Sequence, residues 1–332
     1  MRKTLLFLSL CLATAAVAQK EGGISRKMLD EIQKEQRLTA ADRALVNAIA
    51  GNSIDNLAVN HSNAGAFDTH FSIETKRQSI TDQKSSGRCW MFSGLNVLRS
   101  DYSLRTDSLR TEFSQAYLFF WDQLEKANLM LQGVIDTGTK PIDDERVQFF
   151  FRTPIGDGGT FCGVADLADK YGLVPTEVMP ESFSSDNTSK ARQLISSKLR
   201  EYGLQLREMV QKGKKGSALE KAKIRMLCQI YHMLQYTIGN PPEKFTYAFK
   251  NADGQAVGEP REFTPLTFYK EVTGGQQLNG TFIMVMNDPR RDYYKTYEVE
   301  YDRHTYDGTN WVYLNLPMDD IEKLAKIGRA HV

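Results

Sequence analysis

The chain has 332 residues, of which 41% are hydrophobic and 25% charged, and its net charge at neutral pH is +1. A chain of this length can bury one large core or form two lobes, and so balanced a charge gives no reason to expect nucleic acid or another acidic partner. After the first 20 residues no run is long and apolar enough to cross a bilayer, so we expect no membrane segment in the mature protein.

The first 18 residues have the pattern of a cleaved secretory signal. Arg2 and Lys3 precede the apolar run 5–12, and residues 16–18 (Ala-Val-Ala) supply the small side chains that a signal peptidase requires. We therefore expect Gln19 to begin the mature protein, and we expect the protein to be exported by the Sec route and to be periplasmic or secreted. Residues 21–60, which follow, are charged and have apolar residues at loose helical spacing.

Residues 83–96 read Gln-Lys-Ser-Ser-Gly-Arg-Cys-Trp-Met-Phe-Ser-Gly-Leu-Asn. Polar residues precede Cys89, and apolar residues follow it with no proline before Pro141, which predicts a loop that enters a buried helix at Cys89. Backbone N–H groups at a helix start stabilise negative charge, and this favours a reactive thiolate. The side-chain amide of Gln83 can reach back toward the thiol and, with the Cys89 N–H, form an oxyanion hole. The alternative is a buried structural cysteine.

This string resembles the sequence around the nucleophile of papain-like cysteine peptidases, most of all in the aminopeptidase C and bleomycin hydrolase branch, family C1B. Residues 113–121, 226–231 and 287–290 also resemble this branch, and the resemblance covers nearly all of residues 65–326. It implies an α+β, papain-like fold of two lobes with helical insertions. We predict a mainly helical lobe over residues 19–240 and a β-rich, incomplete lobe over residues 241–326.

The resemblance also implies roles for individual residues. Cys89 would be the nucleophile, Gln83 and the Cys89 N–H would stabilise the oxyanion, and Gly158 and Gly159 would hold the backbone of a peptide substrate, with Trp90 also in the binding site. For the glycines, the alternative is a turn that leads into a helix and nothing more. The resemblance implies peptide substrates, no metal or organic cofactor and, in many relatives, a homo-hexameric ring.

After the signal, the cysteines are Cys89, Cys162 and Cys228. Many exported papain-like enzymes carry a disulfide between positions that correspond here to Ser86 and Gly156, so both halves of that bridge are absent, as in the intracellular members. We predict that Cys162 lies in a helical core. Cys228 and His232 are four residues apart on a predicted helix, but no second pair accompanies them, so we predict core packing and not a metal site.

The chain becomes β-rich after residue 240. Alternating residues 245–249 precede the turn Asn251-Ala252-Asp253-Gly254, which predicts a hairpin. Residues 282–286 predict a buried strand, residues 294–301 and 311–316 predict a second hairpin, and a helix is expected from about Asp319.

Cysteine peptidases also need a histidine that pairs with the thiol and an Asn or Asp that orients it. In the family both lie in strands further along than this chain extends. We assign the role to none of the histidines present, of which His304 is expected at a hairpin tip: His61, His70, His232, His304 and His331.

Residues 327–332, Ile-Gly-Arg-Ala-His-Val, correspond to the translation of a common sequencing adapter. We therefore expect the natural chain to continue beyond about Lys326, and the chain as given to be inactive. The alternative function is an inactive papain-like module that binds peptides.

Overall fold

The structure is a computed structural model that describes residues 22–63, 65, 79–106, 109–308 and 310–328. The predicted signal, residues 1–18, lies outside the described residues, as do His70 and residues 329–332. The chain divides into two compact units, residues 1–72 and 73–332, and each is described by itself.

The described part of the first unit is helical, as its sequence pattern predicts. It contains α1 (Arg26–Glu35), α2 (Ala40–Ala50), α3 (Ile54–Ala58) and the short 3-10 helix η1 (His61–Asn63). Local capping explains where the first two helices begin. The Ser25 hydroxyl accepts from the Met28 N–H, and Thr39 and Asp42 form a reciprocal capping box. None of the residues in these four elements is buried.

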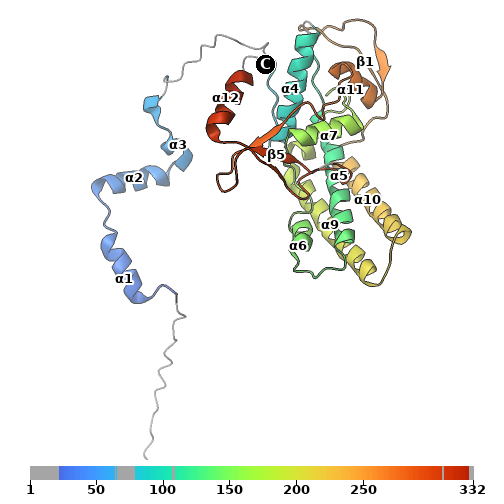
Figure 1. The fold of residues 1–332 in the computed structure, drawn as a ribbon. Coiled ribbons are helices and arrows are strands. Elements are labelled where there is room, and N and C mark those ends of the chain that lie inside the picture. The colour runs from blue at the N-terminus through green and yellow to red at the C-terminus, as the bar shows by residue number, and fades with distance from the viewer. Residues whose placement is uncertain (1–21, 64, 66–78, 107–108, 309, 329–332) are drawn as a thin grey trace, which may run out of the picture. The chain divides into compact units, whose positions relative to one another are not determined.

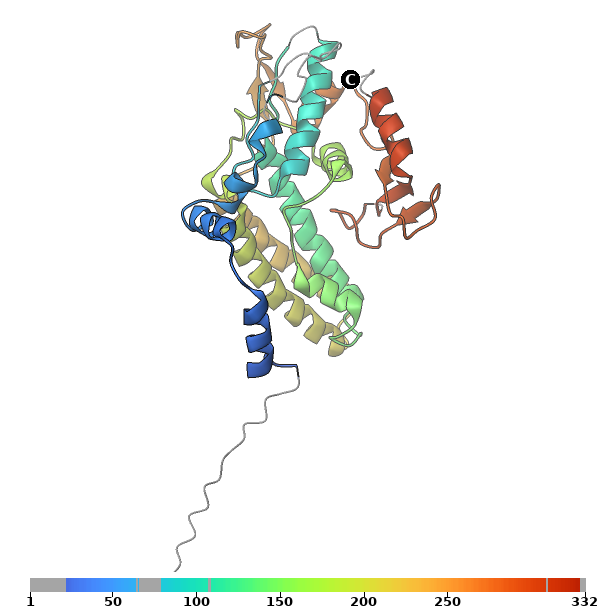
Figure 2. The same ribbon diagram turned by 90° about the vertical axis from the view of Figure 1, so that its left-hand side faces the viewer.

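The second unit is built around long helices. These are α4 (Cys89–Arg105), α5 (Gln115–Asp136), α7 (Phe161–Tyr171), α9 (Thr188–Gln211) and α10 (Ser217–Thr237), with the shorter α6 (Glu145–Arg152) and α8 (Phe183–Asp186) between them. Helix α5 packs against α9, α10 and α7, and α7 also packs against α4. Figure 1 and Figure 2 show α5, α9 and α10 side by side from two directions.

Helix α5 is the central helix of this core. Ser114 caps it, as predicted, by accepting from the Tyr117 N–H at 3.0 Å. Sixteen of its 22 residues are buried, so it is apolar on almost all sides, as expected for a helix with neighbours all around it. Its buried residues also include charged ones, Asp122, Glu125 and Lys126, which become important at the candidate site.

The β-structure follows α10. Strands β1 (Phe245–Tyr247) and β2 (Arg261–Phe263) pair antiparallel, as the hairpin prediction requires, and α11 (Pro265–Thr273) follows. A second sheet has the order β3–β5–β4, with β3 (Met284–Met286) parallel and β4 (Thr296–Glu298) antiparallel to β5 (Val312–Asn315). The second hairpin is therefore confirmed, and α12 (Met318–Gly328) confirms the helix expected from about Asp319.

The prediction of a buried strand at residues 282–286 is wrong in its burial. Strand β3 has no buried residue, and Ile283 just before it is 78% exposed. Among the described strands β3 pairs only with β5, and an apolar run cannot reveal whether another element covers its face.

The prediction of core packing for Cys228 and His232 is also wrong, because both side chains are exposed. The buried stripe of α10 runs through Met226, Ile230 and Leu234. Each of the two exposed residues follows a member of that stripe by two positions, which is about 200° around a helix of 3.6 residues per turn. They line a surface hollow of about 360 Å³ between α5, α7 and α10.

In the described residues, no helix has both the length and the apolar character that a membrane span requires. The division into a helical lobe ending at residue 240 and a β-rich lobe stays a prediction.

Candidate active site

Cys89 lies where the sequence predicts, at the first position of α4. Its side chain is exposed, whereas Trp90, Met91 and Phe92 immediately after it are buried. The N–H groups of Met91 and Phe92 close the first turn by donating to the Arg88 carbonyl at 2.9 and 3.0 Å. The thiol thus faces solvent at a helix N-terminus that the core holds in place, and the alternative of a buried structural cysteine is excluded.

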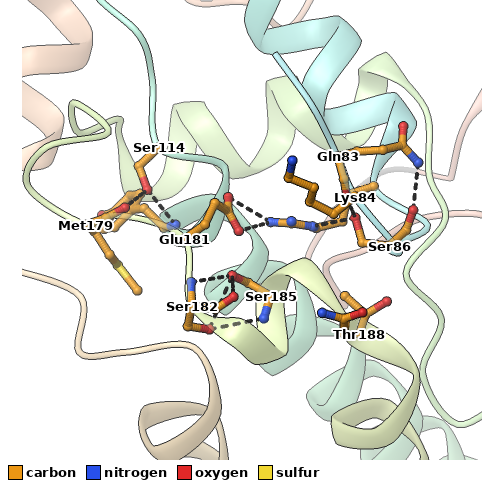
Figure 3. A network of polar contacts seen from close by, with 12 residues as sticks. Gln83, Lys84, Ser86, Ser114, Met179, Glu181, Ser182, Ser185 and Thr188 are labelled. Atoms are coloured by element: carbon orange, nitrogen blue, oxygen red, sulfur yellow. Dashed lines mark hydrogen bonds and ion pairs between the residues drawn. The ribbon is translucent and has the colours of Figure 1, made fainter.

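The segment before the helix, residues 83–88, is called the Cys89 loop below. The Gln83 amide Nε2 donates to the Ser86 carbonyl at 2.6 Å, and the Ser86 hydroxyl donates to the Gln83 carbonyl at 2.6 Å. Figure 3 shows the Gln83 amide directed to Ser86. This bond uses one of the two N–H groups of the amide. The oxyanion role of Gln83 stays a prediction.

Arg88 anchors the Cys89 loop from inside. Its side chain is 0% exposed, and its Nη1 lies 2.9 Å from Oε2 of Glu181. Its Nε donates to the Ser86 hydroxyl at 3.1 Å, and its guanidinium lies over the rings of Phe92 and Phe119 at 5.0 and 5.2 Å. The residue that precedes Cys89 is therefore fixed by a buried ion pair and by two aromatic faces.

Residues 156–160, called the glycine loop below, are held by side chains of α5. Lys126 Nζ donates to the carbonyls of Gly156 and Gly158 at 3.0 and 2.8 Å, and Gln123 Nε2 donates to the Gly156 carbonyl at 2.9 Å. Three donors on two carbonyls fix the loop backbone in one conformation. Gly158 is exposed and Gly159 half-buried, so the loop presents Gly158 to solvent.

The side chain of His304 packs against the glycine loop. It belongs to the connection between β4 and β5, as predicted, but this connection folds inward and the side chain is 4% exposed. A Cβ on Gly159 would lie 2.5 Å from His304 Cε1 and 2.7 Å from Trp90 Cδ2. The Trp90 and His304 rings meet edge to face at 4.8 Å. The expectation that His304 lies in a hairpin connection is therefore confirmed, and its ring fills the space under a residue that has no side chain.

The charges around His304 are arranged so that the imidazole stays neutral. Its Nδ1 lies 2.8 Å from Oδ1 of Asp122, whose Oδ2 accepts from Lys126 Nζ at 2.9 Å. Burial and the nearby Lys126 charge lower the pKa of His304 despite the opposing Asp122 charge. Burial alone would raise the pKa of Asp122, but Lys126 and His304 together hold it below its ordinary value. The charged pair is thus Asp122 with Lys126, and His304 packs beside it.

Trp90 connects Cys89 to the glycine loop. Its indole Nε1 donates to the Asp157 carbonyl at 2.8 Å, and its ring lies under Gly159. The structure therefore brings together Trp90, Gly158 and Gly159 beside the residue that begins α4. The roles of these residues in binding and catalysis stay predictions.

Among the described residues, no three His, Cys, Asp or Glu side chains come close enough together to hold a metal ion. Cys162 is buried in α7, as predicted, and burial raises the pKa of its thiol to about 11.

A family model described as the peptidase C1-like family matches residues 23–328. The chain belongs to the peptidase C1-like family. Aminopeptidase C of Lactobacillus delbrueckii subsp. lactis is 36% identical over 280 residues, which cover 84% of this chain and 62% of the relative. Human bleomycin hydrolase is 34% identical over 258 residues, which cover 76% of this chain and 56% of the relative.

Among solved structures, PepW from Lactobacillus rhamnosis HN001 is similar with a TM-score of 0.84 and 35% identity, over 93% of this chain and 69% of that chain. This confirms the papain-like α+β fold that the resemblance implied. The chain spans about three fifths of the length of the curated relatives it matches.

In this peptidase C1-like chain, sequence reasoning missed the residues that support the site. Arg88 is a charged residue directly before a buried apolar run. Its position was a usable signal, because a charge that is buried with such a run requires a partner of opposite charge. Asp122 and Lys126 are four residues apart on the helix richest in aromatic residues, a spacing typical of an ion pair. The sequence indicated that His304 lies in a hairpin connection but not that its side chain is buried, since burial depends on how this loop folds inward.

Proposed function

We propose that the whole protein is a cysteine peptidase that removes N-terminal residues from peptides. The observation that carries this proposal is the exposed Cys89 thiol at the N-terminus of α4, followed by Trp90, which is bonded to the glycine loop. Family membership supports it, as do relatives named aminopeptidase C and bleomycin hydrolase.

In the proposed reaction the Cys89 thiolate attacks the carbonyl carbon of the scissile peptide bond. The negative oxygen that forms would be stabilised by the Cys89 backbone N–H and by Gln83. The amine then leaves with a proton, and water hydrolyses the thioester, returning the thiol and releasing the carboxylic acid. Gly158 and Gly159 would hold the substrate backbone, with Trp90 beneath them.

We propose that the general base and its orienting residue lie outside this sequence. In the described part of residues 79–328, the histidines are His232, exposed on α10, and His304, packed between Trp90 and Asp122. In that part of the chain neither side chain forms a hydrogen bond with Cys89. We accordingly expect the chain as given to be inactive by itself.

The test uses the protein expressed from the complete gene and a peptide that carries a thiol-reactive electrophile. We expect one equivalent of label on Cys89 and none after Cys89→Ala. The matched control is Cys228→Ala, which removes another exposed thiol and should leave labelling unchanged. Labelling that survives Cys89→Ala would show that another group reacts and would overturn the assignment of Cys89, and an unlabelled wild type would support a peptide-binding module instead.

Aminopeptidase activity is tested by blocking the substrate. We expect a peptide with a free α-amine to be cleaved at least tenfold faster than its N-acetylated form. Equal rates would support an endopeptidase in place of an aminopeptidase.

We also propose export and assembly into a homo-hexamer, from the signal-like residues 1–18 and the family resemblance. N-terminal sequencing of exported protein should begin at Gln19, and light scattering should give six times the protomer mass. An uncleaved N-terminus or a monomer, respectively, would refute these two proposals.

A further inference from the structure

Asp157, between the glycines of the glycine loop, contacts both segments that flank Cys89. Its Oδ2 accepts from the Gly87 N–H at 2.9 Å and from the Thr188 hydroxyl at 2.6 Å, and its Oδ1 accepts from Arg192 Nη1 at 2.9 Å. Its own backbone carbonyl accepts from Trp90 Nε1 at 2.8 Å. One residue therefore joins the Cys89 loop, α4, the glycine loop and α9.

The Asp157 side chain is 13% exposed, so these bonds form largely away from water. Burial alone would raise its pKa, but the bonds from Thr188 and Gly87 and the charge of Arg192 hold the pKa of Asp157 below its ordinary value. The carboxylate is therefore ionised at neutral pH, and charge-assisted hydrogen bonds of this kind are roughly twice as strong as neutral ones.

The Asp157 carboxylate can come this close to the Cys89 loop because residue 87 is a glycine. A Cβ on Gly87 would lie 2.5 Å from Asp157 Cγ and Oδ1, so a side chain at residue 87 would displace the carboxylate. Gly87 is two residues before Cys89, and Asp157 is directly before Gly158. The contact thus couples the position of the thiol to the position of the glycines.

Cys89, Cys162 and Cys228 are all free thiols, so no disulfide between described residues joins the Cys89 loop to the glycine loop. The Asp157 carboxylate joins these two segments by a hydrogen bond from the Gly87 N–H.

We propose that Asp157 is a positioning residue, which fixes the Cys89 loop to the glycine loop so that a peptide held along Gly158 and Gly159 presents its carbonyl to the Cys89 thiol. This inference rests on the proposed function. It assigns no contact between Asp157 and the reacting atoms, so the substitution should affect recognition of a peptide more than reactivity of the thiol.

The experiment compares two electrophiles on the protein expressed from the complete gene. Iodoacetamide reports thiol reactivity, and the peptide electrophile also requires the glycine loop. In Asp157→Asn one amide oxygen replaces two carboxylate oxygens, and the NH2 group faces either the Arg192 donor or the Gly87 and Thr188 donors. We expect the rate with the peptide electrophile to fall about tenfold to a hundredfold, and the rate with iodoacetamide to change less than about twofold.

The matched control is Asp144→Asn, which makes the same chemical change at the N-cap of α6, where the carboxylate pairs with Lys140 at 2.9 Å. It should leave the ratio of the two rates unchanged. If Asp157→Asn does not fold, Thr188→Val, which removes one donor and keeps the side-chain size, should lower the same ratio by a smaller factor.

An unchanged ratio in folded Asp157→Asn or, where that variant does not fold, in Thr188→Val overturns the inference, and so does an equal fall in Asp144→Asn. These outcomes leave the proposed function intact, because the wild type is still labelled at Cys89. A wild type that the peptide electrophile does not label removes both proposals, so the two failures are distinguishable.

Discussion

The junction of the Cys89 loop with the glycine loop and the sheet β3–β5–β4 differ in how their side chains are packed. At the junction even charged groups are enclosed: Arg88 and Asp122 are both 0% exposed, and each has a partner of opposite charge. In the sheet, β3 and β4 have no buried residue, and Asn315 is the one buried residue of β5.

The difference shows which contacts hold each region. Buried ion pairs hold the junction together, and other side chains pack against its glycines. A single substitution there therefore leaves a buried charge without its partner or introduces a side chain for which there is no space. The sheet carries half-exposed apolar side chains, such as Val285 and Val312, whose replacement alters little buried surface. The two regions meet at His304, which the β4–β5 connection places under Gly159.

The largest effect is expected for Arg88→Met. It leaves Glu181, whose side chain is 21% exposed, without its buried partner, and breaking such a pair costs about 3 kcal/mol. For comparison, Ile283→Thr changes an exposed residue directly before β3 and should change the free energy of unfolding by about 0.5 kcal/mol or less. Urea unfolding of both variants measures this difference.

A second variant tests the reason for the Arg88 effect. Arg88→Met combined with Glu181→Leu removes both charges and should recover part of the loss, because a buried ion pair replaced by apolar residues is often neutral. Equal destabilisation by Arg88→Met and Ile283→Thr would contradict the comparison itself.

A smaller effect is expected at the glycine loop, where neighbouring glycines differ. Gly159→Ala brings a Cβ within 2.5 Å of His304 and should destabilise by about 1–3 kcal/mol through overpacking. Gly158→Ala meets nothing within 4 Å and should stay within about 0.5 kcal/mol of wild type. Thermal unfolding of the pair is the measurement. If the two variants melt together, His304 does not pack beneath Gly159 as described.

The smallest effect is expected for the pH dependence of the free energy of unfolding that His304 causes. The unfolded chain takes up a proton near the ordinary pKa of about 6.5, whereas the folded-state pKa is lower, so the unfolded state binds more protons below that pH. The contribution of neutral His304 to the free energy of unfolding is therefore complete above pH 6.5 and is lost as pH falls toward the folded pKa. The free energy of unfolding should fall by at most about 1.4 kcal/mol per pH unit in this range.

Unfolding in urea at pH 7.0 and 5.5 measures this slope. His304→Gln should flatten it, and His232→Gln, which changes an exposed histidine on α10, should not. A slope that His304→Gln leaves intact would show that the proton uptake occurs elsewhere.

The local features of the fold could be predicted from the amino-acid sequence. The loop-to-helix transition at Cys89, the cap at Ser114 and the two hairpins depend on residues near one another in the chain, whose propensities and turn chemistry act over a few positions. The same local strings carried the family resemblance, and with it the papain-like fold.

Which faces of the elements are buried and which charged side chains pair became known from the packing of the whole unit. Cys228 and His232 are exposed because a stripe two positions away is buried instead, and Ile283 is exposed because none of the described elements covers it. Arg88 meets Glu181, and Asp157 meets Gly87, across 93 and 70 residues of chain. Contacts over such separations follow from how helices pack and loops close, which local pattern does not encode.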